Sequence, residues 1–155
     1  MEEDPNYIDA WGYILRLQAL VVGRIEEDLR SRGEISLTWY DVLLALDNAP
    51  GKRLRMSEIA DRIVLSRSAL TRSVDKLEAE GYLKRAPCRD DERGAYAVLL
   101  KKGERALARV RPVYWAGIKK YFAGGLTDAE ISGLESILEK IVAHFRETSA
   151  KERGR

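Results

Sequence analysis

Apolar residues recur at intervals of three and four near both ends of the chain, which is the spacing of one face of an α-helix. Over residues 6–30 they form a main row of Ile8, Trp11, Leu15, Val22, Ile25 and Leu29, widened by Ile14, Leu17 and Val21. Near the other end the row comprises Ile131, Leu134, Leu138, Ile141 and Phe145. Both predicted helices carry more apolar surface than one small domain needs. We interpret the excess as a dimer interface, and the alternative is that the two helices pack on each other within a monomer.

Three further helix starts are predicted from capping residues. Thr38 and Asp41 have the spacing of a capping box, which predicts a short helix that begins there. Ser57 is the expected N-terminal cap of the next short helix. Thr127 and Glu130 form another capping box, which predicts the start of the C-terminal helix.

A longer helix is predicted over residues 67–80, after a four-residue bridge over 63–66. Ser66 is its expected cap, and Gly81 is expected to end it. Its apolar residues Leu70, Val74 and Leu77 lie on one stripe and predict the buried face. A short helix, a tight turn and a longer helix make a helix-turn-helix pattern.

A hairpin and a long helix are predicted next. Residues 82–85 and 96–99 read as two short strands, and the charged stretch 87–94 between them forms the polar tip of a wing. A long helix begins at about residue 101, with a bend expected at Pro112 because proline lacks a backbone donor. The sequence therefore predicts a mainly α fold with one β-hairpin.

The charges are segregated along the chain. The 155 residues carry a formal net charge of +2, but the segment from Lys52 to Arg111 holds 16 Lys/Arg against 9 Asp/Glu, and the two ends together hold 11 against 16. A basic middle between acidic ends is typical of a protein whose centre faces a polyanion. A merely solvated surface is the more common cause of charge runs, but it does not predict this segregation.

Several classes of protein are disfavoured by the composition. The chain has one cysteine, Cys88, and one histidine, His144, which together cannot build a metal site of the usual kind. No Gly-rich phosphate loop or nucleophile motif is present, so we expect neither an enzyme nor a bound cofactor. No apolar stretch is long enough for a bilayer, and the N-terminus is acidic, so a cytoplasmic protein without membrane contact is expected.

The order of elements and two strings of residues resemble the multiple antibiotic resistance regulator (MarR) family. The strings are residues 65–72, Leu-Ser-Arg-Ser-Ala-Leu-Thr-Arg, and residues 91–94, Asp-Glu-Arg-Gly. The resemblance implies a homodimer in which two winged helix-turn-helix lobes bind a palindromic operator on double-stranded DNA. It also implies a repressor that small aromatic or phenolic ligands release.

The expected domain organisation follows from the elements and the resemblance together. Residues 1–155 form a single MarR-like domain. Within it, residues 38–100 are the winged helix-turn-helix lobe of three helices and a β-hairpin wing. Residues 5–31 and 101–148 form the helical dimerisation region.

The side of the predicted helix opposite its apolar stripe supplies the residues expected to read bases. Arg72 and Lys76 can reach guanine in the major groove, while Ser68 and Thr71 are short enough to allow the backbone to approach. Asp75 lies on the same side and is expected to hold Arg72, with acceptance from a cytosine amine as the alternative.

Further contacts to DNA are expected around this helix. Lys52, Arg53, Lys84 and Arg85 are candidate phosphate contacts. At the wing, Asp91 is expected to brace Arg93 for a narrow minor groove, and Gly94 to supply the turn; a loop whose charges pair only with one another is the alternative. The predicted DNA-binding residues are Arg55, Ser66, Arg67, Ser68, Thr71, Arg72, Lys76, Arg89, Asp91, Arg93 and Gly94.

Two expectations concern ligand and class. Aromatic residues could line an effector pocket between the helical region and the DNA lobe, although aromatics at helical spacing are more often core. The candidates are Trp11, Tyr13, Trp39, Tyr40 and Trp115. The rival to a DNA-binding regulator is a winged-helix scaffold for protein interaction, which would not need basic residues at positions 72, 76 and 93.

Overall fold

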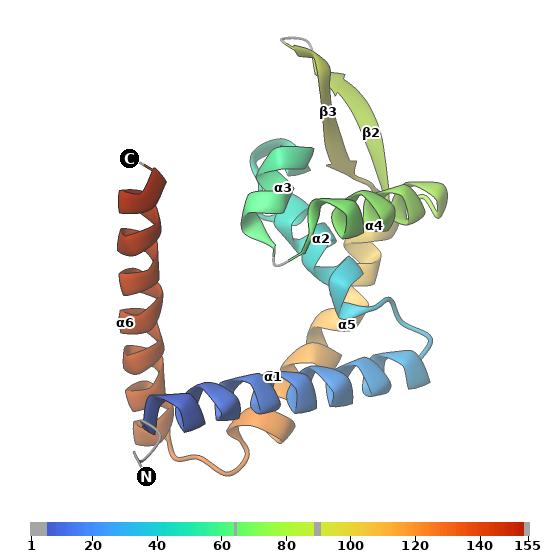
Figure 1. Ribbon diagram of the computed structural model, residues 1–155. Helices are drawn as coiled ribbons and strands as arrows, with labels where there is room; N and C mark the ends of the chain where they lie inside the picture. The colour runs from blue at the N-terminus through green and yellow to red at the C-terminus, as the bar shows by residue number, and fades with distance from the viewer. Residues whose placement is uncertain (1–5, 64, 89–90, 154–155) are drawn as a thin grey trace.

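Helices dominate the computed structural model, which describes residues 6–63, 65–88 and 91–153 (Figure 1). The elements in chain order are α1 (Asn6–Ser31), α2 (Leu37–Asp47), β1 (Arg53–Arg55), α3 (Met56–Arg62), α4 (Arg67–Ala79), β2 (Leu83–Cys88), β3 (Asp91–Leu99), α5 (Lys101–Ile118) and α6 (Asp128–Arg153). A 3-10 turn at Pro50–Lys52 precedes β1, and a π-helical turn at Lys119–Ala123 follows α5. The predicted mainly α fold is confirmed.

α2 lies at the centre of the hydrophobic core. Its Val42, Leu43 and Leu46 have no exposed surface. Around them pack buried side chains from every neighbouring element, namely Ile25, Leu29, Leu54, Ile59, Leu70, Val74, Leu77, Leu83, Ala97, Leu99, Ala106, Leu107 and Val110. The predicted buried stripe of α4 is part of this set. The core therefore joins the C-terminal end of α1 and the first half of α5 to the lobe that carries α3, α4 and the sheet.

Two of the predicted helix caps are confirmed. The Ser66 side chain accepts a hydrogen bond from the Ala69 amide at 3.2 Å. At the start of α6, the Thr127 amide donates to the Glu130 carboxylate at 2.8 Å, and the Glu130 amide donates to the Thr127 hydroxyl at 3.3 Å. Each cap satisfies amides that a helix start leaves without intrahelical partners.

Two other predicted caps were each wrong by two residues. α2 is capped by Ser36, whose hydroxyl accepts from the Trp39 amide, and Thr38 lies inside the helix. α3 begins at Met56 after Arg55, whose amide donates to Glu58 at 2.6 Å, and Ser57 is likewise inside. For α2 a second residue of suitable chemistry, Ser36, lay nearby, whereas α3 begins after Arg55 without a cap from its side chain, so spacing alone located neither start.

The sheet has three antiparallel strands in the order β1-β3-β2, with the wing hairpin projecting beyond α4 (Figure 1). β1 was not predicted, because three residues are too few for an alternating pattern. The hairpin strands are longer than predicted and continue into the charged stretch, so Gly94 lies within β3 and does not form the turn. Ladder hydrogen bonds are made by the backbone, and an exposed hairpin therefore tolerates charged side chains along its strands.

α5 connects the core to the helical end of the molecule. It runs uninterrupted through Pro112, and the π-helical turn lies further on, at Lys119–Ala123. Gly117 of α5 sits so close to α1 that an added Cβ would lie 2.6 Å from Ile25 Cγ1. This close approach fixes α5 against the last turns of α1.

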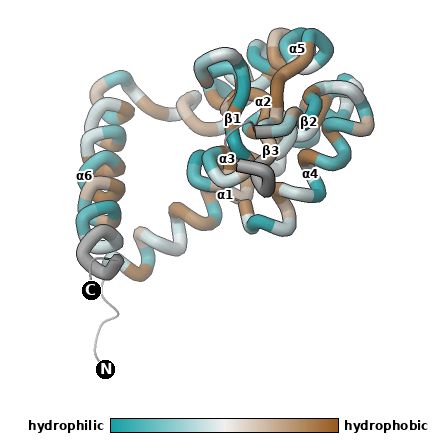
Figure 2. The backbone as a smooth tube through the Cα atoms, turned by 90° about the horizontal axis from the view of Figure 1, so that it is seen from above, coloured by the Kyte–Doolittle hydropathy of each residue, from teal (hydrophilic) through white to brown (hydrophobic). Residues whose placement is uncertain are grey.

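α6 stands apart from the lobe, as both views show (Figures 1 and 2). Its apolar face and the first half of α1 are exposed to solvent. The exposed apolar residues there include Ile8, Trp11, Ile14, Leu15, Leu17, Ile137, Leu138, Ile141, Val142 and Phe145. α6 therefore does not bury these residues against α1 within one chain. Among the described residues, no helix combines the length and apolar character needed to cross a membrane.

Candidate nucleic-acid interface

α4 is held so that one side faces the core and the other faces solvent. Leu70, Val74 and Leu77 are at most 2% exposed, which fixes the rotation of the helix about its axis. Ser66 caps its start, and Gly81 ends it with a φ of +76°, a conformation that glycine adopts without strain. The predicted end at residue 80 differs by only one position from the observed Ala79.

The four residues predicted to read bases are exposed together on the outer side of α4: Ser68, Thr71, Arg72 and Lys76. Within the described part of the chain, Arg72 and Lys76 form no hydrogen bond, ion pair or ring contact. Their charged ends are thus available to an outside partner. Guanidinium and ammonium groups on an exposed helix suit the acceptors of guanine in a major groove.

The start of α4 offers donors to a phosphate. Ser66 and Ser68 are exposed, with their hydroxyls 3.2 Å apart, and Arg67 is exposed between them. Thr71 turns its hydroxyl back to the Arg67 carbonyl at 3.0 Å, which leaves its methyl group outward. A helix N-terminus flanked by serine hydroxyls and an arginine favours an anion through its dipole and its unpaired amides.

An ion-pair cluster joins α4 to the wing and corrects two sequence predictions. The Arg85 guanidinium of β2 donates to Asp75 at 2.6 Å and to Glu78 at 2.5 Å, and the Arg85 amide donates to Glu78 at 2.7 Å. These bonds, the backbone one above all, lower the pKa of Glu78. Asp75 therefore holds Arg85 and not Arg72, and Arg85 is a structural link and not a phosphate contact. Lys84 beside it is exposed, as a phosphate contact requires.

The tip of the wing is described only in part. Arg89 lies outside the described residues. The structure describes Asp91, Arg93 and Gly94 through their backbone in β3, where Asp91 pairs in register with Cys88. The hairpin carries this stretch outward from the core, beyond α4 (Figure 1). The bracing of Arg93 by Asp91 stays a prediction.

The basic residues before α3 divide into two groups. Arg53 and Arg55 of β1 lie over the ring of Tyr96, 5.1 and 5.7 Å from its centroid, and Arg53 is exposed. Lys52 instead bonds Glu104 at 2.8 Å and pairs with Asp47 at 3.0 Å. Two carboxylates within the chain thus hold the Lys52 ammonium group, and its contact with a DNA phosphate stays a prediction.

The five aromatic residues predicted for an effector site lie in different environments. Trp11, Tyr13 and Trp115 are exposed, at 59%, 69% and 64%. Trp39 packs edge-on against Tyr82, with ring centroids 5.8 Å apart. Tyr40 is buried in the core and packs at a tilt against Tyr114, with ring centroids 5.4 Å apart. The structure does not bring these five side chains to one pocket within a single chain.

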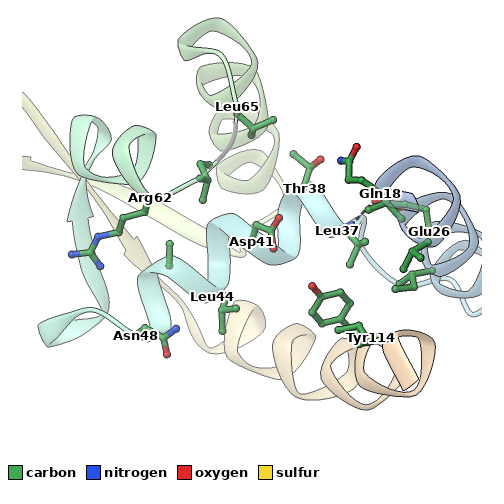
Figure 3. Close-up of a pocket in the computed structure, with 16 residues that line it drawn as sticks. Gln18, Glu26, Leu37, Thr38, Asp41, Leu44, Asn48, Arg62, Leu65 and Tyr114 are labelled. Atoms are coloured by element: carbon green, nitrogen blue, oxygen red, sulfur yellow. Dashed lines mark hydrogen bonds between the residues drawn. The ribbon is translucent and has the colours of Figure 1, made fainter. Parts of the chain in front are cut away.

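A cavity of about 680 Å³ opens instead between α1, α2, α5 and the turn before α4 (Figure 3). Its apolar walls include Val21, Val22, Ile25, Leu44, Leu65 and Ile118. Its polar lining includes Gln18, Glu26, Thr38, Asp41 and Tyr114. These polar residues are distant in the chain and carry no motif, so the sequence alone does not bring them together as one site. Among the described residues, no three potential metal ligands come together.

Comparisons with known proteins agree with the geometry of the lobe. Residues 34–94 match the family model described as MarR family. The HTH-type transcriptional regulator PrsX of Escherichia coli is 31% identical over 136 residues, which are 88% of this chain and 81% of that protein. The HTH-type transcriptional regulator TtmR of Methylorubrum extorquens is 27% identical over 150 residues, 96% of this chain and 73% of that protein.

Solved structures of Streptomyces coelicolor proteins share the fold over nearly the whole chain. AbsC, a MarR family transcriptional regulator, superposes with a TM-score of 0.82 at 27% identity, covering 95% of this chain and 99% of AbsC. Sco3205, a MarR family transcriptional regulator solved in complex with DNA, superposes with a TM-score of 0.81 at 25% identity, covering 92% of this chain and 89% of Sco3205. With an exposed basic helix beside a wing, this chain belongs to the MarR family and is a transcriptional regulator, not an enzyme.

Proposed function

We propose that the protein is a sequence-specific double-stranded DNA-binding repressor that acts as a homodimer on a pseudo-palindromic operator. The observation that carries the proposal is the exposed set Ser68, Thr71, Arg72 and Lys76 on α4, beside the wing. A relative of the same fold, Sco3205, has been solved in complex with DNA. Residues 38–100 form the DNA lobe in this proposal.

The homodimer would be built from residues 5–31 and 101–148. Support comes from the exposed apolar faces of α1 and α6, which the chain does not cover by itself. Exposed apolar surface of this extent marks an interaction site in a protein that is stable in water. A two-fold dimer would place two α4 helices about one helical turn of DNA apart, roughly 10 base pairs.

The proposed contacts separate into base reading and backbone positioning. Arg72 and Lys76 would read bases in the major groove. Arg93 and Arg89 would enter the minor groove from the wing, with Asp91 and Gly94 beside them in the hairpin, while Arg55, Ser66 and Arg67 would hold phosphates. A small-molecule effector would bind between the helical region and the DNA lobe and weaken operator binding, and the cytoplasm is the proposed location.

Selection of bound fragments from random duplex DNA tests the proposal, since it reports the site and its symmetry together. On the selected site, Arg72→Ala should cost about 1–3 kcal/mol and relax the sequence preference, because it removes a base contact. Arg93→Ala should weaken specific and random duplexes more equally. Arg32→Ala, on an exposed residue between α1 and α2 that lies outside the proposed DNA lobe and dimer region, is the matched control and should leave affinity unchanged.

Two results would contradict the proposal. If no duplex is retained at low ionic strength, the protein is a scaffold for protein interaction. If Arg72→Ala and Arg93→Ala lose the same affinity on specific and random duplexes, the two roles are assigned wrongly.

A further inference from the structure

We propose that the cavity between α1, α2 and α5 selects small organic cations, such as an amine carried on an apolar or aromatic body, over anions of the same shape. The inference rests on the proposal that a small-molecule effector controls DNA binding. It adds that this effector carries a positive charge. It follows from which groups line the cavity and which of them already have partners (Figure 3).

The walls of the cavity favour an apolar body. Ile25 of α1, Leu44 of α2 and Ile118 of α5 come from three different helices and enclose a space of about 680 Å³. A volume of this size suits a small organic molecule. Tyr114 adds an aromatic ring, which is held in place by a tilted contact with the Tyr40 ring at a centroid distance of 5.4 Å.

The charged groups of the lining are two carboxylates and one guanidinium, those of Glu26, Asp41 and Arg62. Figure 3 shows the Arg62 guanidinium directed away from Asp41, toward the far side of α3. The positively charged group thus points out of the site on one side, Asp41 lies near its middle, and Glu26 of α1 lies on the opposite side. An anion entering the cavity would approach two like charges.

Glu26 and Asp41 differ in how they are held. One Glu26 carboxylate oxygen accepts a hydrogen bond from the Leu37 amide at 2.8 Å, so this side chain is fixed at the start of α2. Asp41 makes no hydrogen bond or ion pair with the described part of the chain. Partial burial raises the pKa of Asp41, and the nearby Glu26 charge raises it further. Asp41 is exposed at the cavity, and a carboxylate that lacks a partner there is stabilised by a cation.

The phenol of Tyr114 supports the same choice of ligand. Its ring face is negative and attracts cations, and its hydroxyl oxygen can accept a hydrogen bond from an ammonium group. Burial and the charge of Asp41 raise the pKa of Tyr114, which keeps the phenol neutral. The cavity therefore combines an apolar body site with a carboxylate and a ring for a positive group.

The cavity also reaches the DNA-reading helix. Ile63 and Leu65, which line it, belong to the segment that leads into Ser66, the cap of α4. A bound molecule would contact this segment directly. The charge preference can nevertheless be measured without DNA.

The test uses three probes of one shape: 4-phenylbutylamine, 4-phenylbutanol and 4-phenylbutyrate, each titrated into the full chain by calorimetry at pH 7.5. The amine should bind at least about tenfold more tightly than the carboxylate, with the alcohol between them. The Asp41→Asn variant keeps the size of the side chain. It should bind the amine about five- to tenfold more weakly than the wild type, and the difference in affinity between amine and carboxylate should become smaller. Asp61→Asn, on an exposed α3 residue that does not line the cavity, is the matched control and should bind like the wild type.

The preference is overturned if the carboxylate binds as tightly as the amine, if Asp41→Asn and Asp61→Asn behave alike, or if no probe binds at 10 mM. Thermal melting of Asp41→Asn verifies that the variant is folded. Operator binding without probe is measured in parallel, so that a failure of the cavity proposal is distinguished from a failure of DNA binding.

Discussion

Among single residues, Glu104 joins two elements that lie far apart in the chain. It accepts from Lys52 at 2.8 Å and from Lys101 at 2.7 Å, so it ties the turn before β1 to the first turn of α5. Lys52 has a φ of +53°, which is uncommon for a residue with a side chain. The ion pair between Lys52 and Glu104 helps to hold this turn in its conformation.

The effect of Glu104 on stability should depend on pH. Hydrogen bonds from Lys101 and then Lys52 lower the pKa of Glu104 from 4.5 to about 2. A carboxylate with a lowered pKa in the folded state stabilises it above pH 4.5, and this contribution is lost as pH falls from about 4.5 toward 2. Glu104→Gln should therefore lower the melting temperature at pH 7 and make little difference near pH 2.

Melting curves between pH 2 and 7 measure this dependence. Glu80→Gln is the control, because Glu80 is exposed and no bond of its carboxylate is found among the described residues. A Glu104→Gln variant whose deficit is equal at every pH would show that the ion pairs do not stabilise the fold.

The outward direction of Arg72 and Lys76 was predictable, because the buried stripe of α4 determines which residues face solvent. The ion-pair partner of Asp75 was not predictable from the sequence. Arg72, three residues earlier in the chain, was the local candidate, whereas Arg85 comes into reach only when β2 packs beside α4. Local spacing cannot show which of two arginines a carboxylate meets after folding.

Among the elements, α5 and the β2–β3 hairpin meet at Gly103. A Cβ added at Gly103 would lie 2.5 Å from the Tyr82 carbonyl oxygen and 2.6 Å from Leu99 Cδ1. The backbone carbonyl cannot move aside cheaply, so Gly103→Ala should cost about 1–3 kcal/mol of unfolding free energy. Urea denaturation measures the change.

Gly23→Ala is the matched control, since nothing in the chain lies within 4 Å of an added Cβ there. It should leave stability unchanged or raise it by up to about 1 kcal/mol, because alanine favours a helix over glycine. Equal stability of the two variants would mean that α5 can shift away from the hairpin.

The link between α4 and the wing gives a prediction about DNA binding. Arg85→Met keeps the length of the side chain but leaves the carboxylates of Asp75 and Glu78 without their cation. Loss of these partly exposed ion pairs should lower the free energy of unfolding by about 1 kcal/mol. Operator affinity should fall as well, because the hairpin would no longer be held at a fixed position relative to α4.

Lys84→Met separates this effect from a simple loss of charge. Lys84 lies on the same strand and is exposed. Its removal should reduce the salt dependence of DNA binding without changing denaturation by urea. If Arg85→Met also changes only the salt dependence, Arg85 contacts phosphate and does not link the two elements.

The helices of the lobe were predictable because their apolar residues repeat with the period of a helix. β1 was not, since Arg53, Leu54 and Arg55 become a strand only by pairing with residues 96–98. The wing strands were underestimated for a related reason. An alternating apolar pattern marks only the part of a strand that packs on the core, and the hairpin continues beyond it.

At the scale of the whole molecule, sequence periodicity revealed the excess apolar surface of α1 and α6 but not the cavity. The cavity is lined by residues from Gln18 to Ile118, and their convergence depends on how α1, α2 and α5 cross. Sequence reasoning instead favoured aromatic residues, of which Trp11, Tyr13 and Trp115 proved to be exposed. Crossing angles of helices are set by packing across the core, which spacing along the chain does not contain.

The exposed face of α6 yields the last prediction, which concerns assembly. Ile141 and Phe145 are 52% and 70% exposed on the same side of the helix as Leu138. If a second copy covers this face, Ile141→Glu introduces a carboxylate into the interface of each protomer. Burying a charge without a partner is costly, so the dimer should weaken by about 100-fold or more.

Sedimentation measures the dimer, and operator binding reports its consequence. Ser136→Glu adds the same charge on the opposite, polar side of α6 and should remain a dimer. In Ile141→Glu the palindromic site should be bound with the weaker affinity of one lobe, because two lobes linked in a dimer gain from their high effective concentration. An Ile141→Glu protein that stays dimeric would place the dimer contact elsewhere, and the exposed apolar side of α6 would then need another partner.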